Sequence, residues 1–154
     1  MIIIPYKKGL IEGIQYETLQ EEAFFPNEST LQSRNKVKEY LKNFIPVAEL
    51  ARDGIAGKFK QSIDPHDDTL ACNRGQRYSV VYFKSNSVLH FHADNDWLRI
   101  RNECFVVFNH CNIHAVMNTN TKVSYKWVAW MMNMKRSFKY PKGKEFLGDV
   151  VGVW

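Results

Sequence analysis

Two short stretches of the sequence pair a histidine with a carboxylate two residues later, a spacing that suits metal binding. They are His66-Asp67-Asp68 and His92-Ala93-Asp94. In an extended chain, residues i and i+2 point to the same side, so each pair can offer an imidazole and a carboxylate to one ion. A further histidine from a facing strand would complete a set of two histidines and one carboxylate. Such a set leaves coordination positions open and suits Fe(II) and oxygen chemistry.

The histidine that would complete this set is expected in the segment that ends at residue 118. His114 lies in a strand-like run, whereas His110 lies in a predicted turn, so His114 is the better candidate. Between His92 and His114 there is room for about two strands, and the longer interval from His66 to His114 has room for about four strands of ~5 residues with their turns. The longer interval favours His66, Asp68 and His114 as the metal ligands, and a centre at His92 and Asp94 stays open as the alternative.

From Gly57 onward, apolar and polar residues alternate with the period of β-strands. The predicted strands are short, rich in aromatic or β-branched residues, and separated by turn-prone segments. A first strand ends at Pro65, and the others are Tyr78 to Phe83, Val88 to His92, Trp97 to Ile100, Phe105 to Phe108, Ile113 to Val116 and Val123 to Met131. Short strands at this spacing predict an antiparallel sandwich or barrel.

The first 55 residues are expected to form a strand and helices that support this β-rich part. Met1 to Pro5 predicts a short strand. A helix is predicted over residues 31–44, because apolar side chains there recur at helical spacing: Val37, Tyr40, Leu41 and Phe44. A second short helix is predicted over residues 47–53. We therefore expect residues 1–154 to form one domain, mainly β with N-terminal helical support and a core over about residues 57–132.

Composition restricts the classes of protein to consider. The chain is 45% apolar, and no apolar run approaches the ~20 residues that a membrane-spanning helix needs. The three cysteines form no C-x-x-C pair, which argues against a disulfide scaffold and predicts buried, unpaired thiols in a reducing compartment. A cytoplasmic location follows. The net charge of +5 could attract an anionic partner, although much of it comes from a basic segment over residues 135–144.

Residues 59–132 resemble the double-stranded β-helix, or jelly-roll, core of the 2-oxoglutarate- and Fe(II)-dependent oxygenases, which is cupin-like in architecture. His66 and Asp68 match the H-x-D near the end of an early strand. The segment from Phe105 to Asn118 resembles the distal element, in which an apolar strand ends in Phe and an H-x-V-x-N follows a short turn. The segment from Arg77 to Tyr82 resembles the arginine-led strand of aspartyl and prolyl hydroxylase-like members.

The resemblance implies an activity and its cofactors. Fe(II) would be held by His66, Asp68 and His114, and 2-oxoglutarate would be consumed with O₂ while a substrate C–H bond is hydroxylated. The resemblance to amino-acid hydroxylases favours a substrate side chain in a protein, a peptide or a free amino acid. No membrane partner is expected, because the sequence has no apolar run of the length that crosses a bilayer.

The family usually binds the far carboxylate of 2-oxoglutarate with an arginine about ten positions after the distal histidine. Here Lys122 and Lys126 lie near that position, and no arginine does. Lys122-Val123-Ser124 is similar to an arginine-x-serine pair of some members, and Arg77 is a third basic candidate. A lysine offers a point charge without the bidentate fork of arginine. The choice among these residues stays open.

Other readings of the same residues stay open. An oxygenase acting on nucleic acid is the second enzymatic option, and a non-enzymatic jelly-roll or cupin-like binding protein is the third. His90 and His92 share a strand face, so they could form a separate zinc or cupin-like site, line the pocket beside the iron, or lie outside the sheet. The tryptophans of the β-rich part are expected in the core: Trp97, Trp127 and Trp130.

Overall fold

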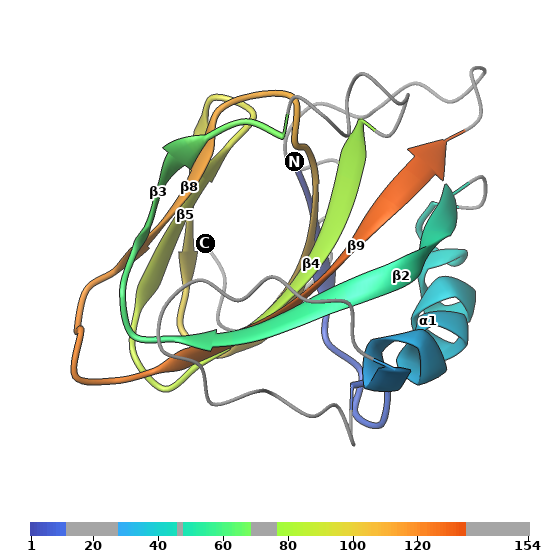
Figure 1. The fold of residues 1–154 in the computed structure, drawn as a ribbon, viewed down its shortest axis with the longest axis horizontal. Coiled ribbons are helices and arrows are strands. Elements are labelled where there is room, and N and C mark those ends of the chain that lie inside the picture. The colour runs from blue at the N-terminus through green and yellow to red at the C-terminus, as the bar shows by residue number, and fades with distance from the viewer. Residues whose placement is uncertain (12–27, 46–47, 69–76, 135–154) are drawn as a thin grey trace.

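The computed structural model describes residues 1–11, 28–45, 48–68 and 77–134 (Figure 1). These residues form one helix and nine strands: β1 (Ile2–Pro5), α1 (Glu28–Leu41), β2 (Ala48–Phe59), β3 (Ile63–His66), β4 (Tyr78–Ser85), β5 (Leu89–Ala93), β6 (Asp96–Ile100), β7 (Glu103–Asn109), β8 (His114–Asn118) and β9 (Tyr125–Met134). Within the same residues, no helix combines the length and hydropathy needed to cross a bilayer.

The strands form two antiparallel sheets that face each other (Figure 1). The five-stranded sheet has the order β1-β7-β4-β9-β2, and the four-stranded sheet has the order β3-β8-β5-β6. The prediction of a mainly β architecture with antiparallel sheets is therefore confirmed.

The strand pairs are nested in the sequence. The strand β5 pairs with β6, β4 with β7, β3 with β8 and β2 with β9, each pair enclosing the previous one. Strands that lie far apart in the chain thus become neighbours. The pairing of β3 with β8 matters most for function, because these strands carry the predicted metal ligands.

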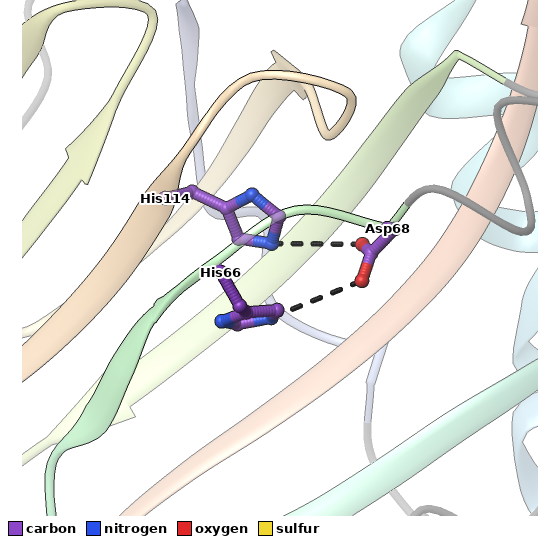
Figure 2. A group of neighbouring side chains, drawn as sticks. All are labelled: His66, Asp68 and His114. Carbon is purple, nitrogen blue, oxygen red and sulfur yellow. Dashed lines mark ion pairs between the residues drawn. The ribbon is translucent and has the colours of Figure 1, made fainter.

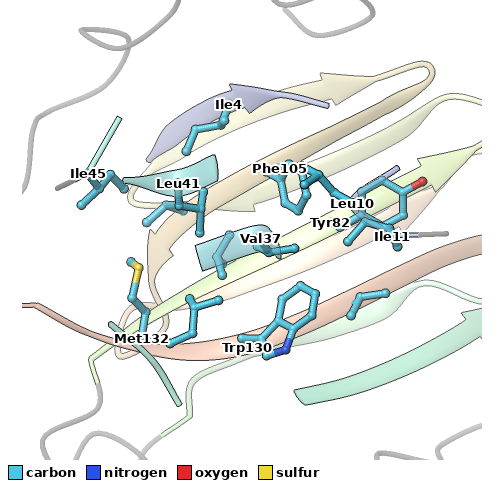
Figure 3. Close-up of a cluster of buried hydrophobic side chains, with 14 of the residues drawn as sticks. Ile4, Leu10, Ile11, Val37, Leu41, Ile45, Tyr82, Phe105, Trp130 and Met132 are labelled. Atoms are coloured by element: carbon cyan, nitrogen blue, oxygen red, sulfur yellow. The ribbon is translucent and has the colours of Figure 1, made fainter. Parts of the chain in front are cut away.

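Apolar side chains pack on both faces of the five-stranded sheet. One cluster lies between the two sheets and includes Phe83, Phe91 and Trp127. The second, outer cluster lies on the opposite face, where Val37 and Leu41 of α1 pack with side chains of the sheet (Figure 3). The central strands β4 and β7 accordingly have runs of consecutive buried residues, whereas β5 alternates buried and partly exposed residues because only one of its faces is covered.

The predicted helix over residues 47–53 is wrong, since residues 48–53 belong to β2, while residue 47 lies outside the described residues. The strand β2 pairs with β9 along most of its length, from Ala48 opposite Met134 to Phe59 opposite Tyr125, with a register shift between Leu50 and Gly54. Hydrogen bonds and packing against β9 outweigh a weak local helix propensity, which tertiary context often overrides.

Two expectations about individual side chains are also wrong. Trp97 is 55% exposed rather than part of the core, although Trp127 and Trp130 are buried as expected. Cys111 takes part in a disulfide bond, whereas Cys104 is a buried free thiol. Residue type alone did not reveal that Trp97 lies on the uncovered face of the four-stranded sheet.

Gly57 allows close contact between β2 and β9. A Cβ atom at this position would lie 2.8 Å from two carbon atoms of the Trp127 indole. That ring is buried and packs edge-on against Phe59, with the ring centroids 5.6 Å apart. We expect Gly57→Ala to lower the free energy of unfolding by about 1–3 kcal/mol through overpacking.

Urea unfolding of both chains measures this loss. A Trp127→Phe background provides the control, because a smaller ring leaves room for the added methyl group and should reduce the penalty. An unchanged unfolding midpoint for Gly57→Ala would show that the indole can shift freely.

Candidate metal centre

Three side chains converge where β3 ends and β8 begins (Figure 2). His66 is the last residue of β3, Asp68 follows two residues later, and His114 is the first residue of β8. Antiparallel pairing places His66 directly opposite His114. The potential ligand atoms of the three residues all lie within 4.8 Å of one another. The structure thus brings together the three residues that were predicted as ligands.

Both imidazole rings are oriented by a backbone carbonyl two residues upstream. His66 Nδ1 lies 2.7 Å from the carbonyl oxygen of Asp64, and His114 Nδ1 lies 2.8 Å from that of Asn112. A carbonyl oxygen only accepts, so each Nδ1 donates its hydrogen and each Nε2 keeps a lone pair. Hydrogen bonds of this kind fix the tautomer and the ring orientation of metal-binding histidines.

Both Nε2 atoms face the carboxylate of Asp68. The distance is 3.8 Å from His66 Nε2 to Asp68 Oδ1 and 3.5 Å from His114 Nε2 to Asp68 Oδ2. Ligand atoms that each lie about 2.1 Å from a shared ion can be at most about 4.2 Å apart, so both separations suit an ion between these groups. Two imidazoles and one carboxylate suit Fe(II), and zinc sites use the same ligand types.

The centre has one buried side and one open side. The side chain of His114 is 8% exposed, and its ring lies 4.9 Å from that of Phe108, measured between centroids. The side chains of His66 and Asp68 are 41% and 33% exposed. An ion held here would contact the core on one side and remain accessible to a ligand from solvent on the other.

Burial lowers the pKa of His114 below its ordinary value, because desolvation penalises the charged imidazolium. The neighbouring His66 and His110 lower this pKa further, while the hydrogen bond to the Asn112 backbone and the Asp68 carboxylate act in the opposite direction. The net lowering favours the neutral imidazole. Neutral histidine is the form that binds a metal ion.

The second candidate pair does not form a comparable centre. His92 lies on the uncovered face of the four-stranded sheet, where its ring packs on Trp97 with the centroids 4.8 Å apart. Asp94 accepts a hydrogen bond from the Asn112 side chain and pairs with the amino group of Met1 at 3.0 Å. Within the described ranges, the only metal-type cluster of three such residues is the one built on β3 and β8.

Lys122 and Ser124 lie at the other end of β8 from the candidate ligands. The strand runs away from His114 to Asn118. There the Asn118 side chain donates hydrogen bonds to the carbonyl oxygens of Lys60 and Val123. Lys122 is exposed in the turn that follows, and Ser124 immediately precedes β9.

Lys126 points to the outer face of the five-stranded sheet. Trp127 lies in the cluster between the sheets and Val128 lies in the outer cluster, so strand alternation turns Lys126 outward. Lys126 stands between Lys58 of β2 and Lys84 of β4, and these three residues form a lysine row across the sheet. This orientation is contrary to the role in cosubstrate binding that the sequence suggested for Lys126.

Arg77 lies at the same end of the fold as the candidate metal ligands. Its carbonyl oxygen accepts a hydrogen bond from the backbone N–H of His110 at 3.1 Å, and the carbonyl oxygen of His110 accepts one from the N–H of Asp68 at 2.9 Å. His110 itself was predicted only as a turn residue, yet it is fully buried. Its burial could not be inferred from the sequence, because its neighbours Asn109 and Asn112 are types typical of exposed turns.

We expect His66→Ala, Asp68→Asn and His114→Ala each to abolish or strongly weaken binding of Co(II), a spectroscopic substitute for Fe(II). Each substitution removes one of the three convergent donors. The measurement is a Co(II) titration followed by visible absorption. His92→Ala is the matched control and should bind as the unsubstituted chain does, because its ring lies on the far face of the sheet. Weakened binding in His92→Ala with normal binding in Asp68→Asn would contradict this assignment.

The lowered pKa of His114 predicts how the metal-free protein responds to acid. In the unfolded chain a histidine titrates near pH 6.5, whereas folded His114 stays neutral to lower pH. Below about pH 6.5 the unfolded state therefore binds more protons, and the free energy of unfolding falls as the pH is lowered towards the folded pKa. Urea unfolding between pH 5 and 8 measures the trend. The free energy of unfolding should change less steeply with pH in His114→Asn than in the unsubstituted chain. An equal pH dependence in both chains would exclude His114 as the cause.

Comparison with protein-family models gives no match, and no curated protein matches this sequence. The candidate centre consists of two oriented histidines and the carboxylate between them, which the pairing of β3 with β8 brings together.

Proposed function

We propose that this protein is a 2-oxoglutarate-dependent, non-haem Fe(II) dioxygenase that hydroxylates a C–H bond. The observation that carries the proposal is the geometry of His66, Asp68 and His114, whose donor atoms face one another from neighbouring strands. Two imidazoles and one carboxylate occupy one face of an ion and leave the opposite positions for cosubstrate and O₂.

The nested strand pairing supports a jelly-roll core for this enzyme. One long antiparallel hairpin that is wound into a sandwich gives nested strand pairs distributed over two sheets, and four such pairs are present here. In this reading β2 to β9 form the eight core strands. The strand β1 extends the five-stranded sheet, and α1 supports its outer face.

The protein residues have distinct tasks in the proposed reaction. The carbonyl oxygens of Asp64 and Asn112 hold the two imidazoles as neutral ligands. Phe108 packs on His114 and keeps water from that side of the centre. When bound, iron and 2-oxoglutarate supply the activation of O₂ that C–H hydroxylation requires. The exposed sides of His66 and Asp68 leave an approach for the substrate.

Arg77 is the best placed of the predicted residues to bind the far carboxylate of 2-oxoglutarate. Two backbone hydrogen bonds through His110 connect it to Asp68, whereas Lys122 lies beyond the opposite end of β8 and Lys126 points outward. An arginine also offers a bidentate fork that matches a carboxylate. We therefore assign this role to Arg77 in preference to the two lysines and Ser124.

The favoured substrate is an amino-acid side chain in a protein, a peptide or a free amino acid. An oxygenase acting on nucleic acid is less favoured, because the lysine row lies on the outer face of the five-stranded sheet, away from the metal ligands. A non-enzymatic, metal-binding jelly roll is the second candidate. It is favoured by the inward positions of β9, which carry Tyr125 and Trp127 rather than a cation.

A cytoplasmic location stays a prediction. It was inferred from cysteines that were expected to be unpaired, and Cys111 is disulfide-bonded. Disulfides are rare in reducing compartments, so this bond weighs against the expectation that the cysteines are unpaired in such a compartment.

An anaerobic Fe(II) titration with 2-oxoglutarate tests the activity. The ternary complex should give a weak visible charge-transfer band, and succinate should form once O₂ and a substrate are supplied. We expect Arg77→Gln to weaken apparent 2-oxoglutarate binding at least about tenfold, since a charge-assisted bidentate contact is lost. The matched control Lys122→Gln removes a positive charge at the other end of β8 and should bind normally.

The alternatives predict different outcomes of the same titration. If Lys122→Gln weakens binding and Arg77→Gln does not, the cosubstrate lies towards the opposite end of the fold. If the unsubstituted chain binds Fe(II) but gives neither the band nor succinate, the non-enzymatic reading is correct.

A further inference from the structure

His110 is a buried histidine that lies outside the proposed ligand set. It follows β7, and its side chain is fully buried. Its Nδ1 atom shares a hydrogen bond with the hydroxyl of Ser79, a buried residue of β4. Its backbone N–H donates to the carbonyl oxygen of Arg77, and its own carbonyl oxygen accepts the backbone N–H of Asp68. One residue thus connects β4, the end of β7 and the segment that carries the acidic ligand.

Asp68 needs such a connection because it lies beyond the end of β3. His66 and His114 are held by the pairing of β3 with β8, whereas Asp68 follows two residues after β3. The hydrogen bond from its N–H to the His110 carbonyl oxygen, 2.9 Å long, ties Asp68 to the segment between β7 and β8. The position of the carboxylate therefore depends on the position of the His110 backbone.

The His110 backbone is held in turn by its own side chain. Ser79 belongs to β4, which is paired on both sides, with β7 and with β9. A strand paired on both sides is the most constrained kind of position in a sheet, so the Ser79 hydroxyl offers a rigid anchor for the imidazole. A continuous path of hydrogen bonds runs from Ser79 through His110 to Asp68.

We propose that His110 is a positioning residue, and that its hydrogen bond to Ser79 sets the place of the Asp68 carboxylate between His66 and His114. The proposal rests on the metal centre described above. Residues that orient a metal ligand commonly change metal affinity by about 10–100-fold when they are substituted. His110 acts through Asp68 and does not itself contact the ion.

Substitutions at both ends of the hydrogen bond test this proposal. We expect Ser79→Ala and His110→Leu each to weaken Co(II) binding by about 10–100-fold. The visible Co(II) bands should also change, because a displaced carboxylate alters the ligand field. His110→Asn, whose amide can reach the place of Nδ1, should restore most of the affinity. The double substitution should be little weaker than either single one, since both remove the same interaction.

Ser85→Ala is the matched control. Ser85 is another buried serine of β4, near the end of the strand away from Ser79, and its hydroxyl is paired with Ser87. The Ser85→Ala substitution should lower the stability about as much as Ser79→Ala does, without changing the Co(II) affinity or spectrum. If Ser79→Ala lowers the melting temperature as Ser85→Ala does and leaves the Co(II) titration unchanged, His110 has only a structural role and the proposal is wrong.

Amide hydrogen exchange provides a readout that needs no metal. The Asp68 N–H should be protected in the metal-free chain, should exchange faster in Ser79→Ala, and should be unaffected in Ser85→Ala. Equal protection in all three chains would overturn the proposal even if a variant binds metal poorly. Failure of the unsubstituted chain to bind Co(II) would instead overturn the metal centre itself, and the positioning role with it.

Discussion

The pairing of β3 with β8 is the contact on which the rest of the candidate site depends. It sets His66 opposite His114, although these residues are separated by most of the β-rich part of the chain. Each histidine then finds a carbonyl oxygen two residues upstream, so the backbone of the same two segments orients the rings. A register shift would separate the histidines and move alternate side chains to the opposite face.

The five-stranded sheet provides the rigid base for that pairing. Its central strands are buried on both faces, by the four-stranded sheet on one side and by α1 with the N-terminal residues on the other. The four-stranded sheet has only one covered face, and so His90 and His92 of β5 lie outside. His66 and His114 lie instead where β3 ends and β8 begins, next to Asp68.

Sequence patterns predicted most of the strands because short, apolar, period-two segments carry a local signal. The sequence patterns failed where contacts with distant parts of the chain decided the secondary structure or the burial of a residue. Residues 48–53 form part of β2 because β9 offers a long hydrogen-bonding partner. Trp97 was expected inside because tryptophan is large and apolar, yet it lies on the uncovered sheet face. His110 lies in a turn, as predicted, but its complete burial and its hydrogen bond to Ser79 could not be inferred from the sequence.

The sequence by itself determined the candidate donors, since the H-x-D spacing and the interval to His114 singled out the three residues that converge. It also determined the β-rich class, because alternation of apolar residues depends only on local order. Only the tertiary structure shows where the basic residues lie relative to the candidate donors. Lys126 faces outward because the next residue of β9, Trp127, points into the cluster between the two sheets. Arg77 is linked to Asp68 because both form backbone hydrogen bonds with His110. Such choices depend on which strands pair, and long-range pairing is not encoded in the spacing of any single segment.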